Sequence, residues 1–281
     1  MLPKILKDLQ NLSIDVALGS VTMSWLFSKA NEIQVPLAVY LVLGVAVWLA
    51  YTFDHLLDAI KIKNKAKTAR HRFHQENFKT LIISWIAILA AGFFIAIVYL
   101  PLQTWKWGSA VVFFIIAHFV FVHFFGSVRS KWVLKEVGVA WCYAAGVVVG
   151  PLSFLDTLSW MQPLSFLFLF TIAFFNLVMF SFFEYKSDVR QGHASIAINY
   201  DKGWIAFIMN SIFFTSLILG TCLLIMGSGN LYFYFLHGHL LFISIFYYMM
   251  ISLSGHLNRA SLYRVLGDGV FIAPLILIVF A

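Results

Sequence analysis

The chain has 281 residues, of which 62% are hydrophobic and only 11% charged, and its mean hydropathy is +0.89. Soluble globular proteins are about half apolar and about a quarter charged, so this composition excludes a water-soluble protein and indicates an integral membrane protein. The formal net charge of +7 is explained by the excess of Lys and Arg that membrane proteins carry on the cytoplasmic side, and it does not require a nucleic-acid partner.

Apolar runs follow one another along the whole chain. A bilayer core of ~30 Å takes about 20 residues of helix. Nine runs reach or nearly reach that length, at 14–30, 35–59, 78–100, 105–125, 134–155, 164–183, 204–226, 231–252 and 266–281. A short helix on the membrane surface is expected before them, because Ile5, Leu6, Leu9 and Leu12 share one helical face. We therefore expect an all-α, polytopic membrane protein with nine transmembrane helices in a single domain, residues 1–281.

The connections between these runs alternate in character. Four are brief and almost free of Lys or Arg, near 31–34, 101–104, 156–163 and 227–230. Four are longer and basic, near 60–77, 126–133, 184–203 and 253–265. With nine spans and a cytoplasmic N-terminus, every Lys and Arg except Lys29 and Lys106 lies on the cytoplasmic side. This asymmetry predicts the orientation and a C-terminus on the far side.

Two acidic pairs stand out among the 12 acids of the chain. Asp54 and Asp58 end the second run, in AYTFDHLLDAIK, and Glu184 and Asp188 end the sixth, in MFSFFEYKSDVRQGH. Residues four apart share a helix face, so each pair can point at one ligand. The pairs are separated by the same 130 residues, which indicates two similar halves, about 1–133 and 134–281.

The chemistry expected of this pattern is diphosphate binding. Carboxylates gathered at a membrane surface repel one another unless a cation joins them. Mg²⁺ is typically held by one or two carboxylates together with substrate phosphates. Two facing acidic pairs surrounded by Lys and Arg therefore suit a magnesium diphosphate site that faces the cytoplasm.

The segments that carry these pairs resemble the UbiA superfamily of intramembrane prenyltransferases. The resemblance rests on YTFDHLLDA with the later RHRFHQENF, on NLVMFSFFEYKSDVRQGHAS, and on the basic approach VRSKWVLKEVGVAWCYAAG. In the second motif, the spacing of the family's polar, acidic and small residues is kept by Asn176, Glu184, Ser187, Asp188, Gly192 and Ser195. The resemblance implies nine helices around a central cavity and Mg²⁺-dependent transfer of an isoprenyl group from an isoprenyl diphosphate to a lipid-soluble, aromatic or similar acceptor within the membrane.

Three positions depart from the family pattern. Ala50 stands where the fuller motif has an asparagine, Ser181 where it has an aspartate, and Glu184 replaces another aspartate. Two other interpretations therefore stay open. One is a terpene cyclase that ionises the same substrate without an acceptor. The other is a non-catalytic lipid-binding membrane protein that has lost part of the site. The sequence leaves the acceptor, the prenyl chain length and the oligomeric state undetermined.

The resemblance assigns roles to the candidate site residues. The catalytic and metal-binding residues are Asp54, Asp58, Glu184 and Asp188. Basic side chains near them are candidates for the diphosphate oxygens, with Lys131 and Arg190 favoured over Arg129, Lys135, Lys186 and Arg72. Aromatic faces attract cations, so the carbocation and prenyl pocket is expected to include Tyr51, Phe53, Tyr143, Phe180, Tyr185 and the nearby Asn176.

The histidines raise a redox metal site as a further alternative. His55, His71, His74 and His193 lie in or after the acidic motifs. The closely spaced His pairs that a di-iron site requires are absent from the sequence, so this class of site is disfavoured. The histidines within spans are expected to form core hydrogen bonds: His118, His123, His237 and His239. Cys142 and Cys222 have no metal-ligand spacing.

Overall fold

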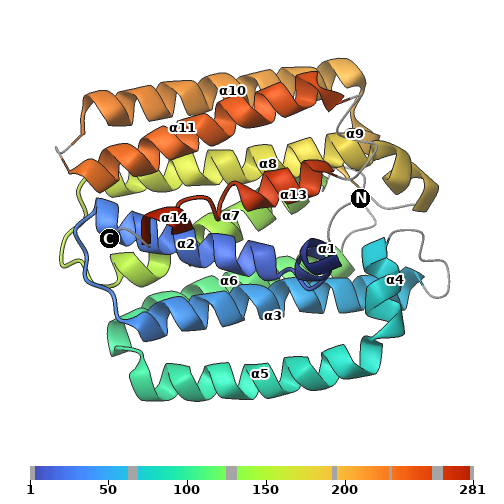
Figure 1. Ribbon diagram of the computed structural model, residues 1–281, viewed down its shortest axis with the longest axis horizontal. Coiled ribbons are helices and arrows are strands. Elements are labelled where there is room, and N and C mark those ends of the chain that lie inside the picture. Colours follow the sequence, from blue (N-terminus) through green and yellow to red (C-terminus); the bar gives the residue numbers. More distant parts are fainter. Residues whose placement is uncertain are drawn as a thin grey trace.

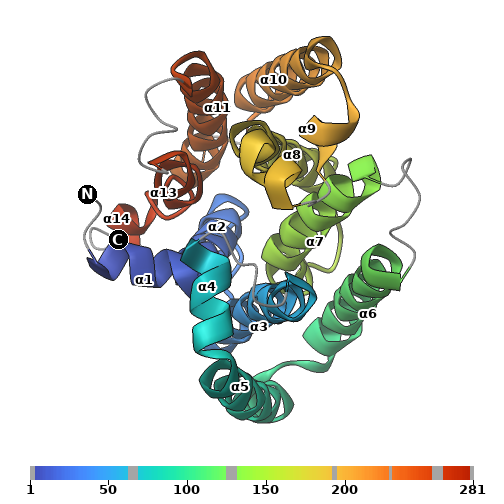
Figure 2. The ribbon, with the colours of Figure 1, turned by 90° about the vertical axis from the view of Figure 1, so that its right-hand side faces the viewer.

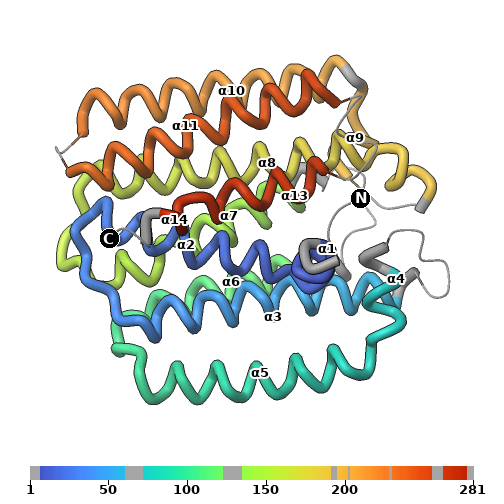
Figure 3. Tube along the Cα trace, viewed as in Figure 1, coloured from blue at the N-terminus to red at the C-terminus, as the bar shows by residue number. Residues whose placement is uncertain are grey.

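The computed structural model describes residues 4–62, 69–124, 132–191, 195–227, 230–254 and 262–278; Figure 3 draws the others in grey. All secondary structure in these segments is helical. Long helices run side by side along one direction (Figure 1). The eight long ones are α2 Ile14–Ala30, α3 Leu37–Ile62, α5 Phe78–Tyr99, α6 Leu102–Phe124, α7 Trp132–Leu152, α8 Met161–Gln191, α10 Lys202–Ile225 and α11 Leu231–Ser252.

Short helices lie at the ends and on the side of this bundle. They are α1 Lys4–Asn11, α4 Ala69–Glu76, α9 Ile196–Asn199, α13 Leu262–Gly269 and α14 Leu275–Ile278. The predicted surface helix at the N-terminus corresponds to α1. The predicted apolar runs agree with the long helices to within a few residues at most ends, because each run is bounded by polar residues, Gly or Pro.

Six of the described helices are long and apolar enough to cross a membrane: α3, α5, α6, α8, α10 and α11. The protein is therefore membrane-embedded in character, as its composition predicted. The helix α2, with 17 residues, is largely enclosed by the others, and Met23 and Leu26 are completely buried. The described helices do not reproduce the full set of nine spans.

The C-terminal run differs most from its prediction. A single helix was expected over 266–281, but α13 ends at Gly269 and turns occupy 270–274 before α14 begins. Gly267 and Gly269 weaken the helix, and Pro274 lacks the backbone N–H that a continuous helix requires. High hydropathy alone was a poor guide here, since it does not register these helix breakers.

The core lies around α8, which packs against α7, α10 and α11. Its side chains Phe168, Ile172 and Phe175 are completely buried. By contrast, α5 and α6 lie at the outside of the bundle (Figure 2) and expose large apolar side chains such as Phe94 and Phe113. Exposed apolar area on this scale suits lipid rather than water.

The two ends of the bundle differ. The short connections lie at one end, and α4 and α9 lie at the other (Figure 1). The C-terminal ends of α3 and α8 both reach the end at which α4 and α9 lie, so both acidic pairs belong to it; we call it the charged end. Lys29 at the end of α2 and Lys106 at the start of α6 lie at the opposite end.

Candidate functional site

The first acidic pair lies in the last turns of α3. Asp54, Asp58 and the intervening His55 each offer a ligand atom, and these atoms lie within 4.8 Å of one another. The C-terminal end of a helix carries a partial negative charge, so carboxylates there are unfavourable unless cations offset them. The buried His55 ring packs edge-on against His74 of α4, with 5.0 Å between ring centroids. The helix α4 thus covers one side of this cluster.

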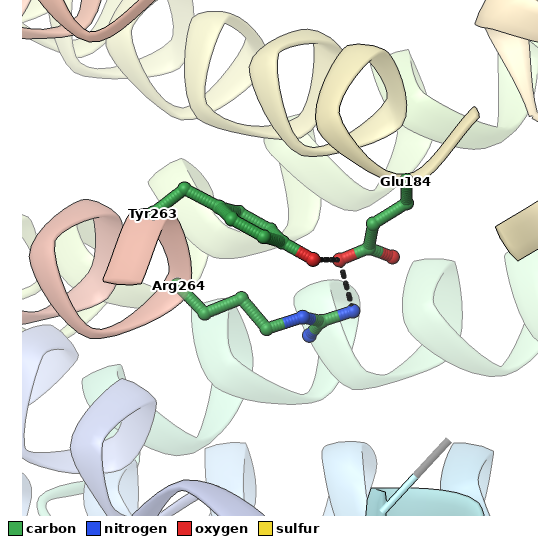
Figure 4. Close-up of polar contacts among 3 residues, drawn as sticks. All are labelled: Glu184, Tyr263 and Arg264. Carbon is green, nitrogen blue, oxygen red and sulfur yellow. Dashed lines mark hydrogen bonds and ion pairs between the residues drawn. The ribbon is translucent and has the colours of Figure 1, made fainter. Parts of the chain in front are cut away.

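The second acidic pair lies at the corresponding end of α8, and Glu184 is held by α13. Its carboxylate forms an ion pair with Arg264 and accepts a hydrogen bond of 3.2 Å from the Tyr263 hydroxyl (Figure 4). Burial, with the nearby Glu184 carboxylate, raises the pKa of Tyr263 to about 12. The phenol therefore keeps its proton at neutral pH and donates a hydrogen bond to Glu184.

Lys135, in the first turn of α7, connects the two acidic pairs. Its ammonium lies close enough to Asp54, Asp58 and Asp188 to interact electrostatically with all three carboxylates. These acids belong to helices far apart in sequence, and only the packing of α3 and α8 against α7 brings them to one cation. Lys135 therefore lies within electrostatic range of one acid of the second pair and both acids of the first.

Two polar side chains near the charged end hold α9 in place. A carboxylate oxygen of the buried Glu136 accepts a hydrogen bond from the Ile196 backbone N–H, at 3.1 Å. The Ser181 hydroxyl accepts one from the Ala197 N–H, at 3.0 Å. Ser181 occupies the position at which the resemblance implies an aspartate, so here that position supports the chain next to the site.

The other predicted basic residues have different surroundings. Arg129 and Lys131 lie outside the described residues, as do His193 and the side chain of His71. Lys186 and Arg190 of α8 and Arg72 of α4 are exposed at the charged end. The sequence pattern did not identify Arg264 as a site residue, although it lies in the last basic connection. Its pairing with an acid 80 residues earlier is set by the docking of α13 on α8, which no local pattern encodes.

Three of the predicted pocket residues line a cavity between α2, α3, α7, α8 and α13. This cavity is small and partly open. Its lining includes Tyr51, Tyr143 and Asn176 together with Asp268. The Asn176 amide donates to the Tyr247 hydroxyl at 2.8 Å and to the Gly267 carbonyl at 3.0 Å. Polar groups therefore hold one wall of the cavity in position.

The remaining predicted aromatic residues lie elsewhere. Phe180 packs under the Arg264 guanidinium, 5.6 Å from its ring centroid, and thus contacts the ion pair rather than the cavity. Tyr185 is exposed, and Phe53 lies on an outer face beside Trp85. Sequence distance from the motifs could not distinguish these residues from Tyr51, since the helix face decides which ring points inward.

Two of the histidines within spans, His237 and His239, form the predicted core hydrogen bonds. His237 is buried and bonds to the Ser165 hydroxyl at 2.9 Å and the Phe233 carbonyl at 2.8 Å. His239 bonds to the Val270 carbonyl at 3.0 Å. These contacts are those of core histidines.

No protein-family model, curated protein or solved structure matches this chain. The site is therefore interpreted from its own geometry. Acidic side chains from two helix ends lie near one ammonium, and a guanidinium is held by Glu184. A small, mostly apolar cavity with a few polar groups lies deeper along the same helices. Such an arrangement can bind a polyanion with a divalent cation at the charged end and an uncharged group below.

Proposed function

We propose that this protein is an intramembrane prenyltransferase of the UbiA type. In this proposal nine helices cross the membrane around a central cavity, the N-terminus and the site face the cytoplasm, and an isoprenyl group passes from its diphosphate to a lipid-soluble acceptor. The observation that carries the proposal is the convergence of Asp54, Asp58 and Asp188 on Lys135. Carboxylates from two helix ends that gather around one cation suit a common polyanionic substrate bound through a metal ion.

The donor set at the charged end fits a magnesium ion. Hard oxygen ligands are what Mg²⁺ prefers, and it needs few protein carboxylates when phosphates complete its coordination. Carboxylate oxygens of Asp54 and Asp58 lie within 4.8 Å of each other, and Asp188 interacts electrostatically with Lys135, as they do. These three residues, with Glu184, would hold the ion. When bound, Mg²⁺ would neutralise the negative charge that develops on the departing diphosphate.

The chain's own residues supply the other requirements of the reaction. Lys135 and Arg264 are fixed cations that would bind and orient the diphosphate oxygens, in addition to the exposed Arg190, Lys186 and Arg72. Arg129 and Lys131 stay candidates from the sequence. Tyr51 and Tyr143 line the cavity one to two turns deeper and would face the cationic end of the prenyl group. The apolar surroundings would exclude water from that carbocation.

A non-catalytic lipid-binding role is favoured by one observation. Ser181 replaces a family carboxylate and is engaged with the backbone of α9. A protein that kept the fold and lost turnover would show this kind of replacement. The cyclase alternative uses the same carboxylates and differs in giving a product without any acceptor.

Binding is the first test. Purified protein in detergent should bind farnesyl or geranylgeranyl diphosphate only when Mg²⁺ is present. Asp188→Asn should weaken this binding by about ten-fold or more, whereas Asp156→Asn, the same change at the opposite end, should not. Absence of any isoprenyl diphosphate binding by the natural sequence would refute the proposal.

Product analysis then separates the alternatives. Membranes that contain the protein are supplied with labelled isoprenyl diphosphate and candidate acceptors. A labelled adduct indicates transfer, a labelled product without acceptor indicates cyclisation, and diphosphate binding without any product indicates the non-catalytic role.

A further inference from the structure

Glu136 follows Lys135 in the first turns of α7, where α7 packs against α8 and α9 (Figure 2). The residue is only 8% exposed. Its carboxylate interacts electrostatically with Lys135 and with Asp188, the last acid of the second motif. The sequence predicted no role for Glu136, because it belongs to neither acidic pair. It nevertheless lies beside a predicted metal-binding residue and the cation that the acids share.

The two oxygens of this carboxylate have different surroundings. Oε1 accepts the hydrogen bond from the Ile196 backbone N–H, at 3.1 Å. Oε2 is buried and has no hydrogen-bond partner among the described residues. The hydroxyl of Ser195, on the other side of the same peptide bond, is also buried and has no partner in the described part of the chain. Burial of a charged oxygen is unfavourable unless a donor or a cation offsets it. Two such oxygens beside one peptide bond therefore indicate a place for a small ligand that oxygen atoms bind.

The Glu136 carboxylate lies next to the Ser181 hydroxyl. The N–H of Ile196 donates to Glu136, and the next N–H along α9 donates to Ser181. Consecutive Cα atoms are about 3.8 Å apart, so the two acceptors are neighbours. Ser181 is the position at which the resemblance implies an aspartate, and Asp188 lies two turns further along the same face of α8. Glu136 therefore brings a carboxylate from α7 to the place where α8 lacks one.

The second acidic pair on its own offers little to a cation. Glu184 is engaged by Arg264 and by the Tyr263 hydroxyl. Asp188 and Glu136 carry like charges and interact with each other, so a divalent cation between them would offset their repulsion. One or two carboxylates are what Mg²⁺ typically takes from a protein when phosphates complete its coordination. Asp188 and Glu136 together meet this requirement.

We propose that Glu136 is a metal ligand: its Oε2, together with Asp188, binds the divalent cation of the charged end and replaces the carboxylate that Ser181 does not provide. Oε1 keeps its hydrogen bond to Ile196 and holds the carboxylate in position. The Ser195 hydroxyl supplies a further oxygen beside the ion. That this ion also binds a diphosphate rests on the proposed prenyl transfer.

Substitutions at Glu136 separate metal binding from support of α9. Calorimetry of purified protein in detergent would measure the affinity for Mn²⁺, which takes the same oxygen ligands as Mg²⁺. Glu136→Gln keeps an oxygen for the Ile196 N–H and removes the charge. It should weaken Mn²⁺ binding at least about ten-fold, or remove one ion where the natural sequence binds two.

Glu136→Asp keeps the charge and withdraws it by the length of one methylene group. It should also lose affinity for Mn²⁺ several-fold, which a charge acting from a distance would not. Glu76→Gln, at an exposed acid of the same end, is the matched control and should change nothing. Unchanged Mn²⁺ binding in a folded Gln or Asp variant overturns the proposal and leaves Glu136 as a support of α9.

Ser181→Asp is a second test, which does not require that a Glu136 variant folds. On its own it should raise the affinity for Mn²⁺ several-fold, because it adds a carboxylate beside the same ion. Combined with Glu136→Gln, it should restore most of the lost affinity. Mn²⁺ binding that Ser181→Asp leaves unchanged in both backgrounds would mean that the ion does not lie between α7 and α8, and would overturn the proposal.

Parallel binding of farnesyl diphosphate with Mg²⁺ distinguishes the two proposals. If Glu136→Gln weakens Mn²⁺ binding and the natural sequence binds no diphosphate, the metal site stands and prenyl transfer fails. If the diphosphate binds, and Mn²⁺ does not bind or binds independently of Glu136, prenyl transfer stands and the role of Glu136 fails. If neither ligand binds, both proposals are wrong.

Discussion

Lys135 is the residue on which most charge at the site converges. Four carboxylates, from Asp54, Asp58, Asp188 and the adjacent Glu136, interact with its ammonium. Without this cation the acids would repel one another at two helix ends whose dipoles already disfavour negative charge. Lys135 thus stabilises this arrangement of carboxylates, and a divalent cation would neutralise the same charges.

We expect Lys135→Met to lower the free energy of unfolding by about 1–3 kcal/mol when divalent cations are absent. Added Mg²⁺ should restore much of the loss, since it neutralises the same carboxylates. Thermal unfolding in detergent, with EDTA or with millimolar Mg²⁺, measures both effects. Lys79→Met removes an exposed lysine at the same end and should show neither. A loss that Mg²⁺ leaves unchanged would mean that Lys135 contributes by packing alone.

Arg264 is paired with Glu184 and, in the proposed function, would compete with a divalent cation for this carboxylate. Its guanidinium forms an ion pair with that carboxylate, which Tyr263 also contacts. We expect Arg264→Gln to raise the affinity for Mg²⁺ alone by several-fold, because Glu184 is released. Affinity for an isoprenyl diphosphate should fall by about ten-fold, because a phosphate-binding cation is lost.

The opposite signs of these two changes make the Arg264→Gln test specific. Calorimetric titration of Mg²⁺ and of farnesyl diphosphate measures them separately. Lys106→Gln, an exposed change of the same charge at the other end, is the control. Parallel loss of both affinities would indicate general damage to the site rather than competition for Glu184.

At the scale of elements, the docking of α13 on α8 decides whether Arg264 and Asp268 reach the site. Gly267 permits this close approach, because a Cβ added there would lie 2.7 Å from a ring carbon of Phe180. Its carbonyl also accepts hydrogen bonds from Asn176 and Tyr247. Any displacement of α13 would therefore disturb the ion pair and the cavity together.

We expect Gly267→Ala to destabilise the protein by about 1–3 kcal/mol, the usual cost of overpacking, and to weaken diphosphate binding. Gly269→Ala lies in the same helix, and a Cβ there would meet nothing within 4 Å, so it should be close to neutral. Thermal midpoints and diphosphate affinities of the two variants provide the comparison. Equal effects of the two substitutions would show that α13 is not fixed by this contact.

The sequence was informative about elements for a physical reason. A long apolar run in a membrane has one favourable structure, the helix, so the long helices could be predicted close to their observed ends. The structure of the C-terminal segment could not be predicted in this way, since two glycines and a proline interrupt the helix within an apolar run. Contacts between elements distant in sequence could not be predicted either. The spacing of the acids predicted that both pairs lie at the same end of the bundle. The Arg264–Glu184 pair and the position of Asp268 depend instead on how α13 packs.

At the scale of the whole molecule, the two ends of the bundle differ in charge. The acidic pairs, Lys135 and Arg264 share the end at which α4 and α9 lie, and the short connections form the other (Figure 1). An isoprenyl diphosphate has the same division, with a highly charged head and an apolar tail. In the proposed function, the bundle would bind the head in water at one end and leave the tail among helices or lipid.

This division predicts the orientation in the membrane, with the charged end in the cytoplasm. The test uses single cysteines at Thr157, in a short connection, and at Glu76, at the charged end, both exposed, after replacement of Cys142 and Cys222. In intact cells a membrane-impermeant maleimide should label Thr157→Cys and not Glu76→Cys, whereas broken cells should label both. The reverse pattern would put the diphosphate site outside the cytoplasm, where the cell's isoprenyl diphosphates do not reach it, and would therefore contradict the proposed reaction as well as the topology.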